Sequence, residues 1–175
     1  YMRGQPWDPW RGVVNPEQMR SDARIYCYGE TYRHQHLANL EYRNSEDDES
    51  YASVQCIEAA CEFVRRNHED DGWHLHLELF DPHEPFDSPQ LYLDEYDDTW
   101  QGPPSTCPDY SPLDPKKDSE EAIMHFRKAY AALLTMNDRK LGRLFAMMDQ
   151  RDMWKDTAVI LTTDHGYLLG EHGLW

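Results

Sequence analysis

The part of the sequence that most constrains the fold is a short apolar run near its end. Residues 157–163 read Thr-Ala-Val-Ile-Leu-Thr-Thr, with Asp156 before the run and Asp164 after it. A continuous run of apolar and β-branched residues of this length is typical of a strand that is covered on both faces, and such strands belong to parallel sheets. Parallel strands need helical crossovers between them, so this run predicts an α/β fold.

The preceding residues supply a second strand and the helices that such a fold needs. Residues 74–80 alternate polar and apolar side chains, which predicts a strand with its leucines on one face. The acidic residues 46–49 predict a helix start, and a second helical pattern runs from Asp118 to Met148. The order helix, strand, loop, helix, strand predicts a central sheet, mostly parallel or mixed, flanked by helices.

The charge of the chain excludes two classes of partner. With 17 Lys and Arg against 33 Asp and Glu, the formal net charge is −16. Nucleic acids and anionic lipids both require a basic face, so we expect no nucleic-acid partner. No apolar run approaches the roughly 20 residues of a membrane span, so we expect none. These observations leave the oligomeric state and the localisation open.

The clearest candidate site follows the apolar run, at Asp164-His165-Gly166. Sites in open α/β sheets lie beyond the carboxyl ends of the strands. A carboxylate and an imidazole placed there can reach one metal ion, and a glycine lets the backbone lie close to a ligand. The alternative is a helix-capping aspartate beside a surface histidine.

A second candidate is His83, within Asp81-Pro-His-Glu-Pro85. This loop also follows a predicted strand, so parallel strands would place His83 and Asp164 on the same rim of the sheet. A histidine at that rim can donate a proton or a hydrogen bond to an anionic substrate. The alternative is a loop histidine fixed between prolines.

A rival metal site is His74-x-His76-x-Glu78, whose three side chains point the same way on a strand. No further ligand follows at a sequence spacing typical of a metal site, so a polar strand face is the favoured interpretation.

Three segments together resemble the catalytic core of the sulfatase family. Residues 156–175 resemble the strand that ends in a Ser/Thr-Asp-His/Asn-Gly metal motif and is followed by Gly-Glu-His-Gly. Residues 80–89 resemble the family's Pro-His-x-Pro loop, and residues 130–143 resemble the helix between the two. The resemblance covers residues from about 46 to 175. It implies an alkaline-phosphatase-like α/β fold that is incomplete, in which residues 1–175 are part of one sulfatase catalytic domain.

The resemblance also implies roles for individual residues. Asp164 and His165 would be metal ligands, with calcium as the first choice and manganese or zinc as alternatives. His83 would contact the sulfate or assist the leaving group. The substrate would be a small-molecule or carbohydrate sulfate ester. Many family members have asparagine at the position of His165, and members with histidine include phosphonate and phosphodiester hydrolases.

The family's nucleophile is a formylglycine made from a C/S-x-P/A-x-R motif, and no cysteine or serine of this sequence fits it. The family's first pair of aspartate ligands and its catalytic lysine are also missing. We therefore expect a fragment whose formylglycine lies outside this chain, and which is inactive alone. The alternatives are a phosphonate monoester or phosphodiester hydrolase of the same superfamily, and a non-catalytic metal-binding remnant.

Overall fold

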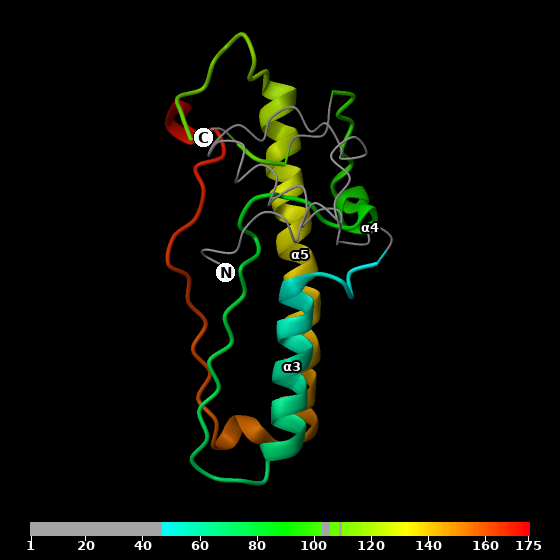
Figure 1. Ribbon diagram of the computed structural model, residues 1–175, viewed down its shortest axis with the longest axis vertical. Coiled ribbons are helices and arrows are strands. Elements are labelled where there is room, and N and C mark those ends of the chain that lie inside the picture. Colours follow the sequence, from blue (N-terminus) through cyan, green and yellow to red (C-terminus); the bar gives the residue numbers. More distant parts are fainter. Residues whose placement is uncertain (1–46, 103–105, 109) are drawn as a thin grey trace, which may run out of the picture.

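The computed structural model describes residues 47–102, 106–108 and 110–175 (Figure 1). Its helices are α3 (Ala52–Asn67), the short α4 (Gln90–Leu93) and α5 (Glu120–Gln150). Three 3₁₀ turns complete the helical elements: Asp94–Tyr96, Met153–Lys155 and Glu171–Gly173. Among the described helices, none combines the length and the apolar character needed to cross a membrane.

The two long helices confirm the helical patterns, although the first begins later than predicted. The hydroxyl of Ser119 accepts a hydrogen bond from the Ala122 N–H and caps α5, whose 31 residues extend over about 46 Å. The acidic residues 46–49 were predicted to open the first helix, but α3 begins at Ala52. Asp48 is instead engaged by the ammonium of Lys140, from α5, and by the hydroxyl of Tyr92.

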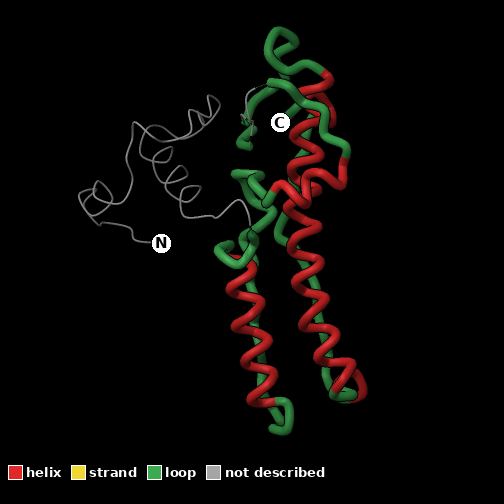
Figure 2. The backbone as a smooth tube through the Cα atoms, turned by 90° about the vertical axis from the view of Figure 1, so that its right-hand side faces the viewer, coloured by secondary structure: helices red, strands yellow, loops and turns green. Residues whose placement is uncertain are grey.

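Helices α3 and α5 lie side by side and form one layer (Figure 2). Their contact is a core of buried apolar side chains at helical spacing. The members of this core are Ile57, Ala60, Cys61, Val64, Leu144, Met148 and Met153. Two extended segments, residues 73–80 and 157–163, run along the other side of this layer (Figures 1 and 2).

The first extended segment has the alternation that the sequence predicts. Leu75, Leu77 and Leu79 are partly buried and pack on the core between α3 and α5, whereas the residues between them are exposed. The segment makes no strand pairing within the described residues, so the leucine face is confirmed while the sheet is not.

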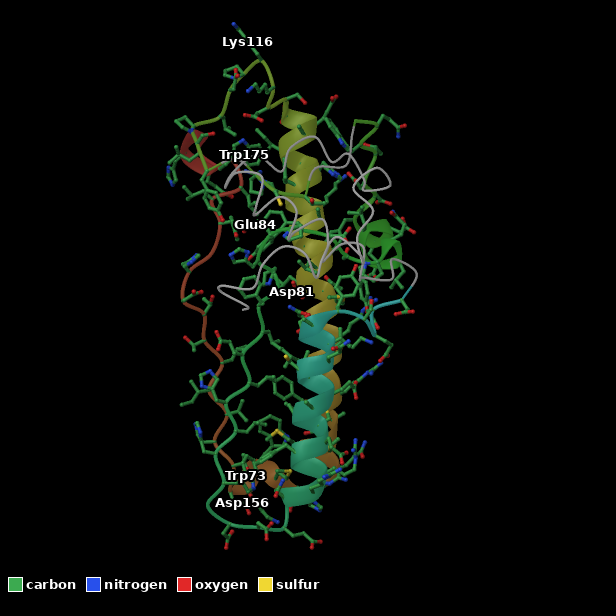
Figure 3. The ribbon with its side chains drawn as sticks, in the orientation of Figure 1. Trp73, Asp81, Glu84, Lys116, Asp156 and Trp175 are labelled. Atoms are coloured by element: carbon green, nitrogen blue, oxygen red, sulfur yellow. The ribbon has the colours of Figure 1, made fainter. Side chains whose placement is uncertain are left out.

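The second extended segment differs from its prediction. The run 157–163 was expected to be covered on both faces, yet Ile160 is 88% exposed and Leu161 is 80% exposed. Figure 3 shows that both segments rise in the same direction, from Trp73 and Asp156 at one end of the molecule. A hollow of about 540 Å³ separates them, lined by residues of both segments. The run is uncovered because nothing described fills this hollow.

The segment after the second run turns back onto α5 at Gly170. Gly170 has a φ of 94°, and a Cβ added there would lie 2.8 Å from Cγ2 of Ile123. We expect Gly170→Ala to lower the free energy of unfolding by about 1–3 kcal/mol, because it adds a clash to a left-handed backbone conformation. Chemical denaturation followed by circular dichroism measures the change. Gly166→Ala is the control, since a Cβ there meets nothing within 4 Å; an equal loss in both variants would contradict the prediction.

Candidate functional site

The loop after the first extended segment is anchored by both long helices at Asp81. Ser53 of α3 donates a hydrogen bond to the Asp81 carboxylate, and the amide of Asn137 on α5 donates to the Asp81 carbonyl at 2.9 Å. All three side chains are buried. The loop therefore leaves the helical layer from a fixed point, and the orientation of the residues that follow is set from there.

The imidazole of His83 is held on one nitrogen and on one face. Its Nδ1 lies 2.9 Å from the Glu84 carboxylate oxygen Oε2 and 2.9 Å from the Glu84 carbonyl oxygen. Both partners are acceptors, so Nδ1 carries the proton. The ring stacks on Phe80, with centroids 4.4 Å apart. With Nδ1 engaged, Nε2 is the ring nitrogen through which His83 can meet a substrate.

Glu84 is almost wholly buried, with 1% of its surface exposed. The hydroxyl of Tyr167 donates a hydrogen bond to its carboxylate. Burial by itself would raise the pKa of Glu84. The hydrogen bond from His83 and the charge of His83 outweigh burial, so the pKa of Glu84 lies below its ordinary value. The bond to Glu84 raises the pKa of His83 against the opposing effect of burial. Both shifts favour the charged forms of the two groups.

Asp164 and His165 lie at the end of the second extended segment, where both side chains are exposed. The His165 N–H donates to the Asp164 carboxylate at 2.8 Å, which helps to hold the pKa of Asp164 below its ordinary value. The other carboxylate oxygen lies 3.7 Å from Nε2 of His165. Two donors on one divalent cation lie about 3–4 Å apart, so this oxygen and nitrogen fit one ion.

Tyr167 joins the two candidate loops. Its ring lies 6.3 Å from the His83 ring and 5.1 Å from the Phe86 ring, both edge-on. Phe86 in turn packs against Phe126 and Tyr130 of α5. The structure thus places the ring of Tyr167, two residues after His165, against the loop of His83.

Comparisons with known proteins identify the family of the chain. A model of the Sulfatase family matches residues 10–175. The chain belongs to the sulfatase family. Family membership implies an alkaline-phosphatase-like α/β fold, of which the described residues show the helices and two extended segments.

Three relatives of this sulfatase-family chain show how the similarity is distributed. The multifunctional alkaline phosphatase superfamily protein PehA of Trinickia caryophylli is 46% identical over 55 residues, which are 31% of this chain and 11% of PehA. The choline-sulfatase of Rhizobium meliloti is 30% identical over 133 residues, 64% of this chain and 25% of the relative. Human iduronate 2-sulfatase is 39% identical over 49 residues, 28% of this chain and 9% of the relative. No solved structure matches the chain.

The chain spans between 9% and 30% of the lengths of these three relatives and of three further ones. Within residues 47–102, 106–108 and 110–175, no group of three or more His, Cys, Asp or Glu side chains is placed to hold a metal ion. His74, His76 and Glu78 are exposed and form no such group. Asp164 and His165 would thus need further ligands from outside the described residues.

Sequence reasoning missed Glu84 and Tyr167 as members of this site. Glu84 was visible only as one more acidic residue in an acidic chain, and its burial depends on residues far away in the sequence. The one local feature at Glu84 is Pro85, which restricts the backbone of the residue before it but does not bury its side chain. For Tyr167 there was no signal beyond its closeness to His165.

Proposed function

We propose that the chain is part of the catalytic domain of a metal-dependent sulfatase, which hydrolyses sulfate esters with a formylglycine nucleophile supplied from outside this chain. The observation that carries the proposal is the contact through Tyr167 between the His83 loop and the Asp164-His165 segment, in a chain of the sulfatase family. The names of two relatives, choline-sulfatase and iduronate 2-sulfatase, support sulfate esters as the substrate class.

The proposal includes a mostly parallel central sheet. Residues 73–80 and 157–163 run in the same direction with a hollow between them, and no strand pairing joins them in the described part of the chain. A strand from outside the described residues, placed in the hollow, would cover Ile160 and Leu161 and give both segments a partner. Such a strand would complete the sheet expected of an α/β fold.

In this proposal Asp164 and His165 hold a divalent cation, with calcium as the first choice and manganese or zinc as alternatives. The carboxylate is a hard oxygen donor that suits calcium, and the imidazole is the softer donor that keeps manganese and zinc open. When bound, the cation supplies positive charge against the sulfate oxygens. His83 acts from the neighbouring loop, where its protonated ring donates a hydrogen bond from Nε2 to the sulfate or to the departing oxygen.

The experiment uses a protein of the relatives' length that contains these residues, with p-nitrophenyl sulfate as substrate. We expect Asp164→Ala to lower kcat/KM at least about 100-fold and to lower the bound metal measured by elemental analysis. Asp156→Ala is the matched control, because this exposed aspartate lies at the other end of the same extended segment. Unchanged metal content and activity in the Asp164→Ala protein would overturn the assignment.

A second candidate function is hydrolysis of phosphonate monoesters or phosphodiesters. The 46% identity to a superfamily protein named as multifunctional favours it, together with the histidine at position 165. Bis(p-nitrophenyl) phosphate and p-nitrophenyl phenylphosphonate, assayed beside the sulfate, distinguish the two functions. A larger kcat/KM for either phosphorus ester would select the second candidate. The 175 residues alone are proposed to be inactive on all three substrates, because they contain no formylglycine motif.

A further inference from the structure

We infer that Glu84 is a positioning residue for His83: its buried carboxylate accepts the Nδ1–H of the imidazole, so that Nε2 is the nitrogen presented to the substrate. The inference deepens the proposed function, on which it rests for the identity of the substrate. The positioning itself concerns only groups within this chain, and it has a readout that does not require catalysis.

The contact between the two side chains is built to be rigid. Oε2 of Glu84 is 2.9 Å from Nδ1 of His83, and the Glu84 carbonyl oxygen lies at the same distance. The two residues are neighbours, and Glu84 is followed by Pro85, so the loop itself carries both acceptors to the same ring nitrogen. A side chain that is 1% exposed has little freedom to leave this contact.

Two aromatic residues restrict the remaining motions of the pair. Phe80 stacks on one face of the His83 ring and limits its rotation. Tyr167 donates its hydroxyl hydrogen to the Glu84 carboxylate. Because Tyr167 follows Asp164-His165-Gly166 directly, the carboxylate that orients His83 is itself oriented by the segment that carries the candidate metal ligands. The two halves of the site are therefore aligned through Glu84.

The charges around His83 favour its protonated form. The groups that face it are Glu84 and Asp81 from its own loop and the hydroxyl of Tyr167 from the C-terminal segment. The hydrogen bond and charge of Glu84 and the charge of Asp81 raise the pKa of His83. The protonated ring therefore stabilises the folded chain below its ordinary pKa, and that contribution is lost as the pH rises through the raised pKa.

Long-range ¹H–¹⁵N spectra of the chain labelled with ¹⁵N-histidine test the inference across a pH titration. We expect His83 to show a raised pKa and, above it, the Nδ1–H tautomer. Glu84→Gln should lower the pKa of His83 toward its ordinary value, and Tyr167→Phe should also shift it, because the carboxylate loses one of the donors that orient it. His68, whose Nδ1 contacts the Arg65 carbonyl oxygen, serves as the internal reference, and its signals should be the same in every variant.

Glu78→Gln is the control variant, since Glu78 is exposed on the preceding segment. If Glu84→Gln does not fold, Tyr167→Phe decides the question, because it leaves Glu84 in place. A wild-type His83 in the Nε2–H tautomer would overturn the inference. The inference would also be overturned if the tautomer and the pKa of His83 were the same in the wild type and in every variant of Glu84 and Tyr167 that folds.

Activity in the protein of full family length separates this inference from the proposed function. We expect Glu84→Gln to lower kcat with little change in KM, and to move the pH profile in the direction that the His83 titration moves. His83→Ala should remove most of the activity. Full activity in His83→Ala would overturn the proposed role of His83, while the spectra would still decide whether Glu84 positions the ring.

Discussion

Replacing Lys140 by alanine is expected to lower the free energy of unfolding by about 3–5 kcal/mol. The Lys140 side chain is 5% exposed, and its ammonium donates a hydrogen bond to Asp48, which is 13% exposed. Removing the cation leaves a carboxylate in a site with little water, and an unpaired buried charge is among the most costly defects in a protein. Urea denaturation of the 175-residue chain, followed by circular dichroism, measures the loss.

The matched control is Arg143→Ala, one turn further along α5. Arg143 lies 2.6 Å from Glu58, but these side chains are 50% and 42% exposed, so water already screens the pair. We expect a change of at most about 1 kcal/mol there. Equal losses in the two variants would show that the Lys140 site is as well solvated as the Arg143 site and would contradict the prediction.

The contribution of the Lys140–Asp48 pair to the free energy of unfolding also depends on pH in a defined direction. Desolvation would raise the pKa of Asp48, but its bonds to Lys140 and Tyr92 outweigh that effect and lower it. The ionised carboxylate therefore stabilises the fold above its ordinary pKa, and this contribution disappears as the pH falls through the lowered pKa. Burial, together with the hydrogen bond to the same carboxylate, raises the pKa of Tyr92 to about 12. The difference between wild type and Lys140→Ala should thus shrink in acid.

Leu133→Ala is expected to lower the free energy of unfolding by about 2–5 kcal/mol. Leu133 is fully buried on α5, where it packs with Tyr51, Val54 and Met136. The substitution removes apolar surface from this core and leaves a cavity that the surrounding helices fill only in part. The same urea titration measures the change.

Leu134→Ala provides the control within the same turn of α5. Leu134 is 48% exposed, so its truncation opens no cavity. The two substitutions change helix propensity equally, and their difference therefore isolates the contribution of packing. Losses of similar size in the two variants would mean that the cluster around Leu133 is loosely packed, against the burial that the structure shows.

The helices were the most predictable part of the fold, for reasons that α5 illustrates. Its apolar residues repeat at helical spacing, and Phe126, Leu133, Leu144 and Met148 are indeed buried. Leu134 lies next to Leu133 in the same helical pattern yet is half exposed, because spacing alone does not say how wide a face the neighbouring elements cover. The burial of Lys140 was not predictable, since it depends on a partner 92 residues away.

His83, Asp164 and His165 were singled out from the sequence, and their roles in a site stay predictions. The sequence places His83 and Asp164 just after extended segments, and the structure brings their loops together through Tyr167. The carboxylate of Glu84 between these loops depends on tertiary packing that no local pattern encodes. The run 157–163 shows the converse: its composition is that of a covered strand, but coverage requires neighbours, which the described residues do not contain.

The hollow between the two extended segments also bears on how a nascent protein of this family reaches its final form. The layer of α3 and α5 has a core of its own, so this layer can assemble while the apolar run still faces water. During that interval Ile160 and Leu161 lie in an exposed, extended apolar segment, which chaperones and other nascent chains can bind. In the proposed fold, this exposure ends when the strand proposed for the hollow covers the two side chains.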